Sequence, residues 1–159
     1  RLELEAWINK IGYNATKYAS SNMDFSLDES VRGQTLKNNE LFAFTFKFEM
    51  PTYLLLLDVD SAGALSIIYP AKENELTALP ANKVIFIPRE DSYEKIMVGP
   101  PYGTDHLLAF GFESKPDFLK ELIGKQYTKS SSEFTHLKQQ LMNLNVRYSF
   151  ASLDLITVP

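Results

Sequence analysis

The sequence predicts a mainly β fold, an antiparallel β-sandwich-like domain with one or two C-terminal helices packed on it. Two patterns predict the strands: short runs alternate apolar with polar residues, and proline, glycine or aspartate separates the runs. Helical segments appear only after Ser114. Short strands that bury one face need a second layer to cover them, which favours two packed sheets. If the helices are larger than expected, the fold class becomes α+β.

The strongest strand signal lies between residues 40 and 69. Every second residue of its first run is an aromatic ring that would point to one face: Phe42, Phe44, Phe46 and Phe48. After Pro51, the run from Tyr53 to Val59 is nearly all apolar, as is typical of a central strand covered on both faces. Asp60–Gly63 is a turn in which Gly63 can adopt a positive φ, and Leu65–Tyr69 returns. These runs predict a β-hairpin.

Shorter strands are predicted at residues 83–87, 94–98 and 106–114, each bounded by proline or glycine. Residues 1–35 form an N-terminal extension. Within it, residues 2–8 alternate leucine, alanine and isoleucine with glutamate and tryptophan, which we interpret as an edge strand, although leucine and glutamate also favour helix. Residues 9–35 are polar and poorly periodic, and no element is assigned there. The run 153–158 predicts a closing strand.

A helical segment is predicted over residues 116–146. Pro116 suits the first turn of one helix, and Gly124 ends it. Ser130 and Glu133 stand at capping-box spacing before a second helix. An apolar stripe in that helix would lie against the sheet: Phe134, Leu137, Leu141 and Leu144. With a β core over 38–116, the whole chain 1–159 is expected to form one domain, its helices packed on an edge or end of the sandwich.

Composition excludes several classes of function. The net charge of −4 argues against a nucleic-acid partner held by phosphate contacts. Cysteine is absent, which excludes thiol catalysis, disulfides and zinc sites built on thiolates, and there are only two histidines. No run approaches the roughly 18 apolar residues of a membrane span. We therefore expect no cofactor and no membrane span, and the start at Arg1 rather than Met indicates a processed or excised chain.

The turn that begins at Asp58 resembles the start of a calcium loop. Such a loop needs an oxygen ligand at its fifth position and a bidentate glutamate at its twelfth, where this chain has Ala62 and Tyr69. We interpret the segment as a hairpin turn in which Asp58 and Asp60 accept local backbone hydrogen bonds, and we predict no metal site.

The most unusual segment is Pro100–His106, a stiff loop that displays Tyr102, Asp105 and His106. Asp105 could orient the imidazole of His106 as a general base, but no Gly-x-Ser-x-Gly nucleophile motif is present. Tyr102 could contact a partner, stack on a sugar, or fold inward and plug an open end of the sandwich. If the domain binds a ligand, we expect this loop and the neighbouring Asp58–Gly63 turn to form the site, rather than the helices.

The central segment also resembles a known family. The resemblance rests on the hairpin run Tyr53–Asp60 with Gly63, the return strand Leu65–Pro70, a strand ending at Pro88, and the stretch from Gly99 through Pro100–His106 to Pro116. In this order, residues 38–116 resemble the bacterial domain of unknown function 4384 family. The chain has Tyr69 where the family has phenylalanine, and Ala71 where an asparagine follows the proline. The resemblance implies a β-sandwich-like accessory domain in bacterial multidomain proteins, joined to protease-like, kinase-like or envelope-lipoprotein regions, and supplies no catalytic residues.

These observations lead us to expect a non-enzymatic accessory or interaction domain of a bacterial envelope-associated or exported multidomain protein. Its partner would be another protein or a neighbouring domain of the same chain, and its location periplasmic or extracellular. Two alternatives remain open: a carbohydrate-binding β-sandwich module with a glycan partner, and a hydrolase that uses Asp105 and His106.

Overall fold

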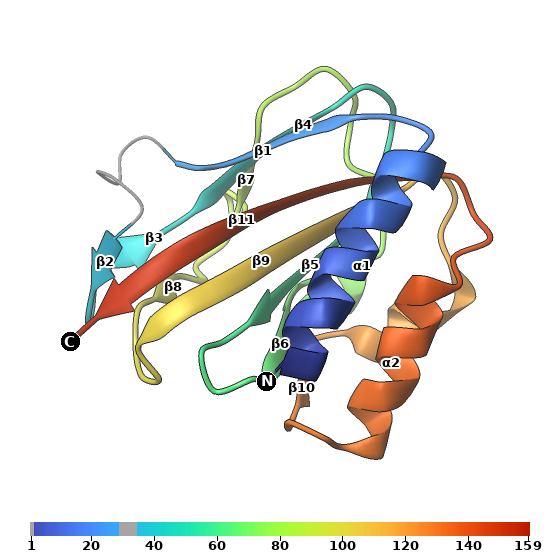
Figure 1. Ribbon diagram of the computed structural model, residues 1–159. Helices are drawn as coiled ribbons and strands as arrows, with labels where there is room; N and C mark the ends of the chain where they lie inside the picture. The colour runs from blue at the N-terminus through green and yellow to red at the C-terminus, as the bar shows by residue number, and fades with distance from the viewer. Residues whose placement is uncertain (1, 29–34) are drawn as a thin grey trace.

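A six-stranded sheet forms the centre of the computed structural model, which describes residues 2–28 and 35–159 (Figure 1). In spatial order the strands are β10 (Gln126–Tyr127), β6 (Leu65–Tyr69), β5 (Tyr53–Val59), β9 (Gly103–Phe112), β11 (Tyr148–Val158) and β2 (Thr35–Lys37). All neighbours are antiparallel except β11 and β2. The predicted hairpin is confirmed, because β5 pairs with β6 across the turn at Gly63, whose φ is 89°.

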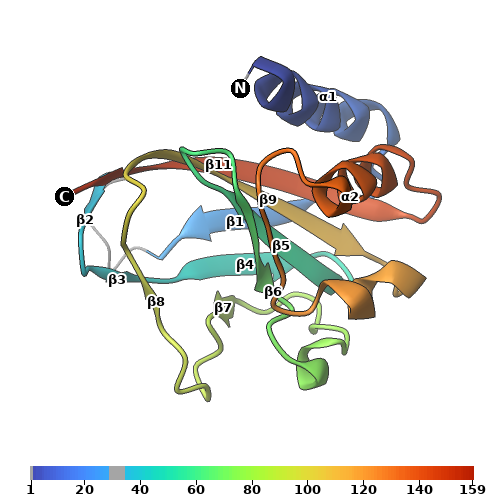
Figure 2. The same cartoon turned by 90° about the horizontal axis from the view of Figure 1, so that it is seen from below.

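A smaller sheet covers one face of the six-stranded sheet (Figure 2). Its strands are β1 (Met23–Leu27), β4 (Phe44–Phe48) and β7 (Ile85–Ile87). The aromatic rings of β4 point into the core between the sheets, where each is at most 2% exposed. A separate short ladder joins β3 (Leu41–Phe42) to β8 (Ile96–Met97). The predicted mainly β sandwich is therefore confirmed. β1, an edge of the smaller sheet, lies within residues 9–35, for which the sequence predicted no element.

Two helices, α1 (Leu2–Tyr18) and α2 (Ser132–Met142), cover the other face of the six-stranded sheet (Figure 2). Trp7 packs edge to face against Phe134, with ring centroids 6.2 Å apart. Two short 3-10 helices complete the fold, η1 (Glu73–Glu75) and η2 (Asp117–Leu122). The helices thus form a third layer over a face, whereas we had expected them on an edge or end. Among the described residues, no helix is long and apolar enough to cross a membrane.

The strand predicted at residues 2–8 is wrong. In α1, the residues that pack on the sheet are Leu4, Trp7, Ile8, Ile11 and Ala15, which recur with helical spacing. Over seven residues the same sequence also fits alternation, but the helical period continues to Tyr18 and buries Trp7, which a strand would have placed on the polar face.

The C-terminal segment differs from the prediction in three details. Pro116 precedes the 3-10 helix η2 rather than an α-helix. The cap of α2 is Ser131, whose hydroxyl accepts a hydrogen bond from the Phe134 amide at 3.1 Å, while Ser130 has a φ of 65°. The closing strand starts at Tyr148, so β11 is eleven residues long and pairs with β9 inside the sheet.

Candidate functional site

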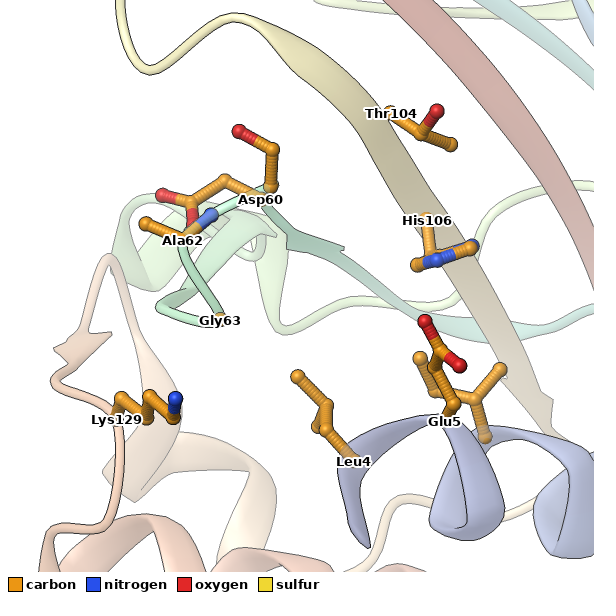
Figure 3. A pocket seen from close by; sticks show the side chains of 10 residues that line it. Leu4, Glu5, Asp60, Ala62, Gly63, Thr104, His106 and Lys129 are labelled. Atoms are coloured by element: carbon orange, nitrogen blue, oxygen red, sulfur yellow. The ribbon is translucent and has the colours of Figure 1, made fainter. Parts of the chain in front are cut away.

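A cavity of about 330 Å³ lies between the N-terminal half of α1 and the β5–β6 turn (Figure 3). Four segments far apart in the sequence form its walls. They contribute Leu4, Glu5 and Ile8 from α1, residues 60–63 from the turn, Thr104 and His106 from β9, and Lys129 from the loop before α2. Sequence reasoning pointed to the turn and to His106, but it missed the contributions of α1 and Lys129.

The β5–β6 turn is held by the Asp60 carboxylate, as the sequence predicts. Its Oδ1 accepts hydrogen bonds from the amides of Ala62 at 2.9 Å and Ala64 at 3.0 Å. The carboxylate is therefore already engaged by the backbone, as in an Asx turn rather than a calcium loop. The same prediction is wrong for Asp58, whose buried Oδ1 has no hydrogen-bond partner among the described residues. Within the described residues, no group of three or more histidine, aspartate or glutamate side chains could hold a metal ion.

The turn is fastened to the loop before β9. The Ser61 hydroxyl donates a hydrogen bond of 2.8 Å to the backbone carbonyl of Tyr102. Gly103 has a φ of 134°, and a Cβ at this position would lie only 2.9 Å from the Ser61 Cβ, so glycine permits the close approach. The structure thus brings together the two loops that we expected to form one surface.

Tyr102 itself is half-buried. Its side chain packs against the core between the two sheets, in the cluster that contains Leu107 and Leu155. This position corresponds to the plug that the sequence left open as an alternative, and it leaves only part of the side chain for contact with a ligand.

His106 faces the cavity and pairs with a carboxylate from another strand. Its Nδ1 lies 2.7 Å from Oδ1 of Asp154, the residue directly opposite it on β11. Asp105 precedes His106 on an extended strand and therefore points to the opposite face. The predicted Asp105–His106 pair is thus replaced by Asp154–His106. The two partners stand 48 positions apart, and only the β9–β11 register aligns them.

On the opposite face of the sheet, Asp58 and Asp105 form a pair of carboxyl groups. Burial, the hydrogen bond to Asp105 and the negative charge nearby raise the pKa of Asp58 to about 9. Burial likewise raises the pKa of Asp105. Asp58 is therefore protonated near neutral pH and donates to Asp105. Both side chains are half-buried on the inter-sheet face, and neither lines the cavity.

The chemistry available in the cavity is that of an oriented imidazole beside polar and charged groups. Asp154 fixes the histidine ring, as the third member of a catalytic triad does. A hydrolase would also need a nucleophile within hydrogen-bond reach of the imidazole. Thr104 stands on the same face two residues earlier (Figure 3), but within the described chain no hydrogen bond joins it to His106. The cavity therefore supplies polar and charged groups that can bind a ligand, with an imidazole oriented by Asp154 among them.

Comparison with known proteins agrees with the sequence resemblance. Residues 35–113 match the family described as Domain of unknown function (DUF4384), and this segment, from β2 through β9, belongs to it. Two of the cavity walls, the β5–β6 turn and the start of β9, lie inside the matched segment, whereas α1 and Lys129 lie outside it. The chain has no significant match among curated proteins or among solved structures.

Proposed function

We propose that this chain, whose central segment is a DUF4384 domain, is a non-enzymatic accessory domain that binds a protein partner or a neighbouring domain of its own parent protein. One observation carries the proposal: separate segments converge on a cavity whose loops are held by internal hydrogen bonds. Loops that are fixed before binding lose little conformational entropy when a partner docks.

Lys129 and the apolar residues of α1 indicate what a partner would offer, on a lining that also contains the carboxylates of Glu5 and Asp60. Lys129 makes no ion pair within the described part of the chain and projects along one wall (Figure 3). Leu4 and Ile8 supply apolar surface on the α1 side. A partner segment with an acidic side chain beside an apolar one would satisfy both walls.

Hydrogen exchange tests this proposal, with the chain measured alone and within its full-length parent protein. We expect slower exchange at residues 60–64 and 103–106 in the parent, because a docked partner would cover them. Lys129→Glu should remove that protection, whereas Lys120→Glu, an exposed change of the same charge on η2, should leave it intact. Equal exchange in both contexts, or protection confined to another surface, would exclude the docking of a neighbouring domain at this cavity.

A hydrolase remains the second candidate, because His106 and Asp154 form an oriented pair inside the cavity. It requires that His106→Ala and Asp154→Asn each abolish turnover of an ester, peptide or glycoside while the fold persists. Turnover that survives both substitutions, or no turnover on such a panel, would leave the binding function as proposed.

We also propose that the parent protein is bacterial and associated with the envelope or exported, which places this chain in the periplasm or outside the cell. The support is the family to which the central segment belongs and the absence of cysteine from the sequence. Fractionation of cells that produce the full-length protein tests this location, and recovery in the cytosolic fraction alone would refute it.

A further inference from the structure

A second hollow, of about 670 Å³, lies on the helical side of the molecule, between η2 and the C-terminal end of α2. Its volume falls within the range of about 300–1,000 Å³ that is usual for small-molecule sites. Phe118 and Leu144 supply apolar surface, and four amide side chains surround them: Gln139, Gln140, Asn143 and Asn145. This hollow is separate from the cavity at His106, and the inference drawn from it does not depend on the proposed function.

Most of these amides have hydrogen-bonding capacity to spare. Asn143 donates from Nδ2 to the Gln139 carbonyl at 3.0 Å, which leaves its side-chain oxygen without a donor. Within the described residues, the side chains of Gln139, Gln140 and Asn145 make no hydrogen bond to protein. Each primary amide offers two donors and one acceptor in a plane, an arrangement that suits neighbouring hydroxyl groups.

Phe118 provides the apolar partner for such a ligand. Its ring is half-buried and held edge to face by Phe112, with centroids 6.2 Å apart, so it lines the hollow in a defined orientation. An aromatic surface of this kind packs against the C–H face of a sugar ring while amide groups bind the hydroxyls at its edge.

From this lining we infer that the hollow binds a neutral saccharide. The formally charged residues that line the hollow, Lys115 and Asp117, have opposite signs, and His136 adds a ring that can donate or accept a hydrogen bond. The lining therefore does not favour an anion or a cation. An extended peptide would gain most from a free strand edge, but this hollow is bordered by a 3-10 helix, an α-helix and a loop. A neutral ligand rich in hydroxyl groups matches the exposed amides and the aromatic ring of the lining.

A glycan array followed by isothermal titration calorimetry on the intact chain tests the inference. The titrated probes would be cellobiose, maltotriose and the disaccharide of N-acetylglucosamine, together with any neutral glycan that the array identifies. We expect saturable binding that the double variant Gln139→Ala/Asn145→Ala weakens by at least about tenfold, because it removes the hydrogen bonds from two amides to the ligand's hydroxyl groups. Both residues are exposed, so the thermal melting temperature should stay unchanged.

Asn38→Ala is the matched control, because Asn38 is an exposed amide beside β2, outside the hollow. It should leave saccharide binding at the wild-type level. No binding to any neutral glycan, or binding that the double variant does not weaken, overturns the inference. Binding of an extended peptide library in place of saccharides, lost in the double variant, overturns it as well.

Discussion

The two faces of strand β9 place neighbouring residues in opposite environments. On the face toward the smaller sheet, Asp105 lies beside Asp58, and burial raises the pKa of both carboxyl groups. On the face toward α1, His106 binds Asp154, whose side chain is 61% exposed. The half-buried Asp58–Asp105 pair therefore makes the stability of the fold depend on pH. The His106–Asp154 pair is partly solvated and can be reached by a ligand.

This difference shows which pair belongs to the fold and which to a surface. A buried carboxyl without a counterion avoids the cost of desolvation by keeping its proton. A solvated ion pair contributes little to stability, because water screens it and two side chains lose freedom. We therefore expect changes on the inter-sheet side to alter stability and changes at the cavity to alter binding.

The largest effect should come from the core between the sheets. Phe46 is 1% exposed, and its ring stacks on Phe25 at 4.6 Å and on Phe48 at 5.8 Å. Phe46→Ala should lower the free energy of unfolding by about 3–5 kcal/mol, since it removes a buried ring and leaves a cavity. Urea denaturation measures this loss.

The matched variant on the helical side is Phe150→Ala. Phe150 is half-buried, and its ring centroid lies 5.0 Å from that of Phe110. Its removal should therefore lower the free energy of unfolding clearly less than removal of the fully buried Phe46. Equal losses for the two variants would show that the degree of burial does not set the cost of removing these rings.

The second effect is a pH dependence that Asp58 imposes. In the unfolded chain Asp58 releases its proton near its ordinary pKa of 3.8, but in the folded chain it holds the proton up to about pH 9. The folded state therefore binds more protons in this interval. Its stabilisation is complete below the lower value and is lost as pH rises, with a slope of at most about 1.4 kcal/mol per pH unit.

Asp58→Asn should remove that slope, because asparagine cannot ionise yet can still donate a hydrogen bond to Asp105. The unfolding free energy of the variant should therefore approach that of the wild-type protein near pH 5 and exceed it near pH 9. Parallel curves for the two proteins would show that Asp58 does not titrate between these limits. Asp154→Asn, at the exposed pair, is the control and should leave the slope unchanged.

Sequence reasoning reached the features whose signals are local. The hairpin follows from the Asp60–Gly63 turn between two apolar runs, and the smaller sheet's central strand follows from the alternation of Phe44, Phe46 and Phe48. Helix α1 was missed because residues 2–8 fit two periods at once. The His106–Asp154 pair depends on the register of strands joined through η2 and α2, and no local pattern specifies it.

Tyr102→Ala should have an intermediate effect. Because its side chain is half-buried against the inter-sheet core, we expect a loss of about 1–2 kcal/mol, less than removal of a fully buried ring. Tyr93→Ala, at a fully exposed tyrosine, should change stability by less than about 0.5 kcal/mol. A loss at Tyr102 as small as that at Tyr93 would free Tyr102 for a contact role and reopen it as a sugar platform.

The smallest stability effect should come from His106→Ala. The hydrogen bond with Asp154 is partly solvated, so its removal should lower the unfolding free energy by less than about 1 kcal/mol. The imidazole nevertheless lines the cavity together with Thr104 and Lys129, so the same change should lower the affinity of any partner that docks there. Thermal melts and hydrogen exchange in the parent protein measure the two effects separately. A large loss of stability, with unchanged protection from hydrogen exchange at residues 60–64, would mean that His106 stabilises the fold and does not contact a partner. The two faces of β9 would then not differ in function.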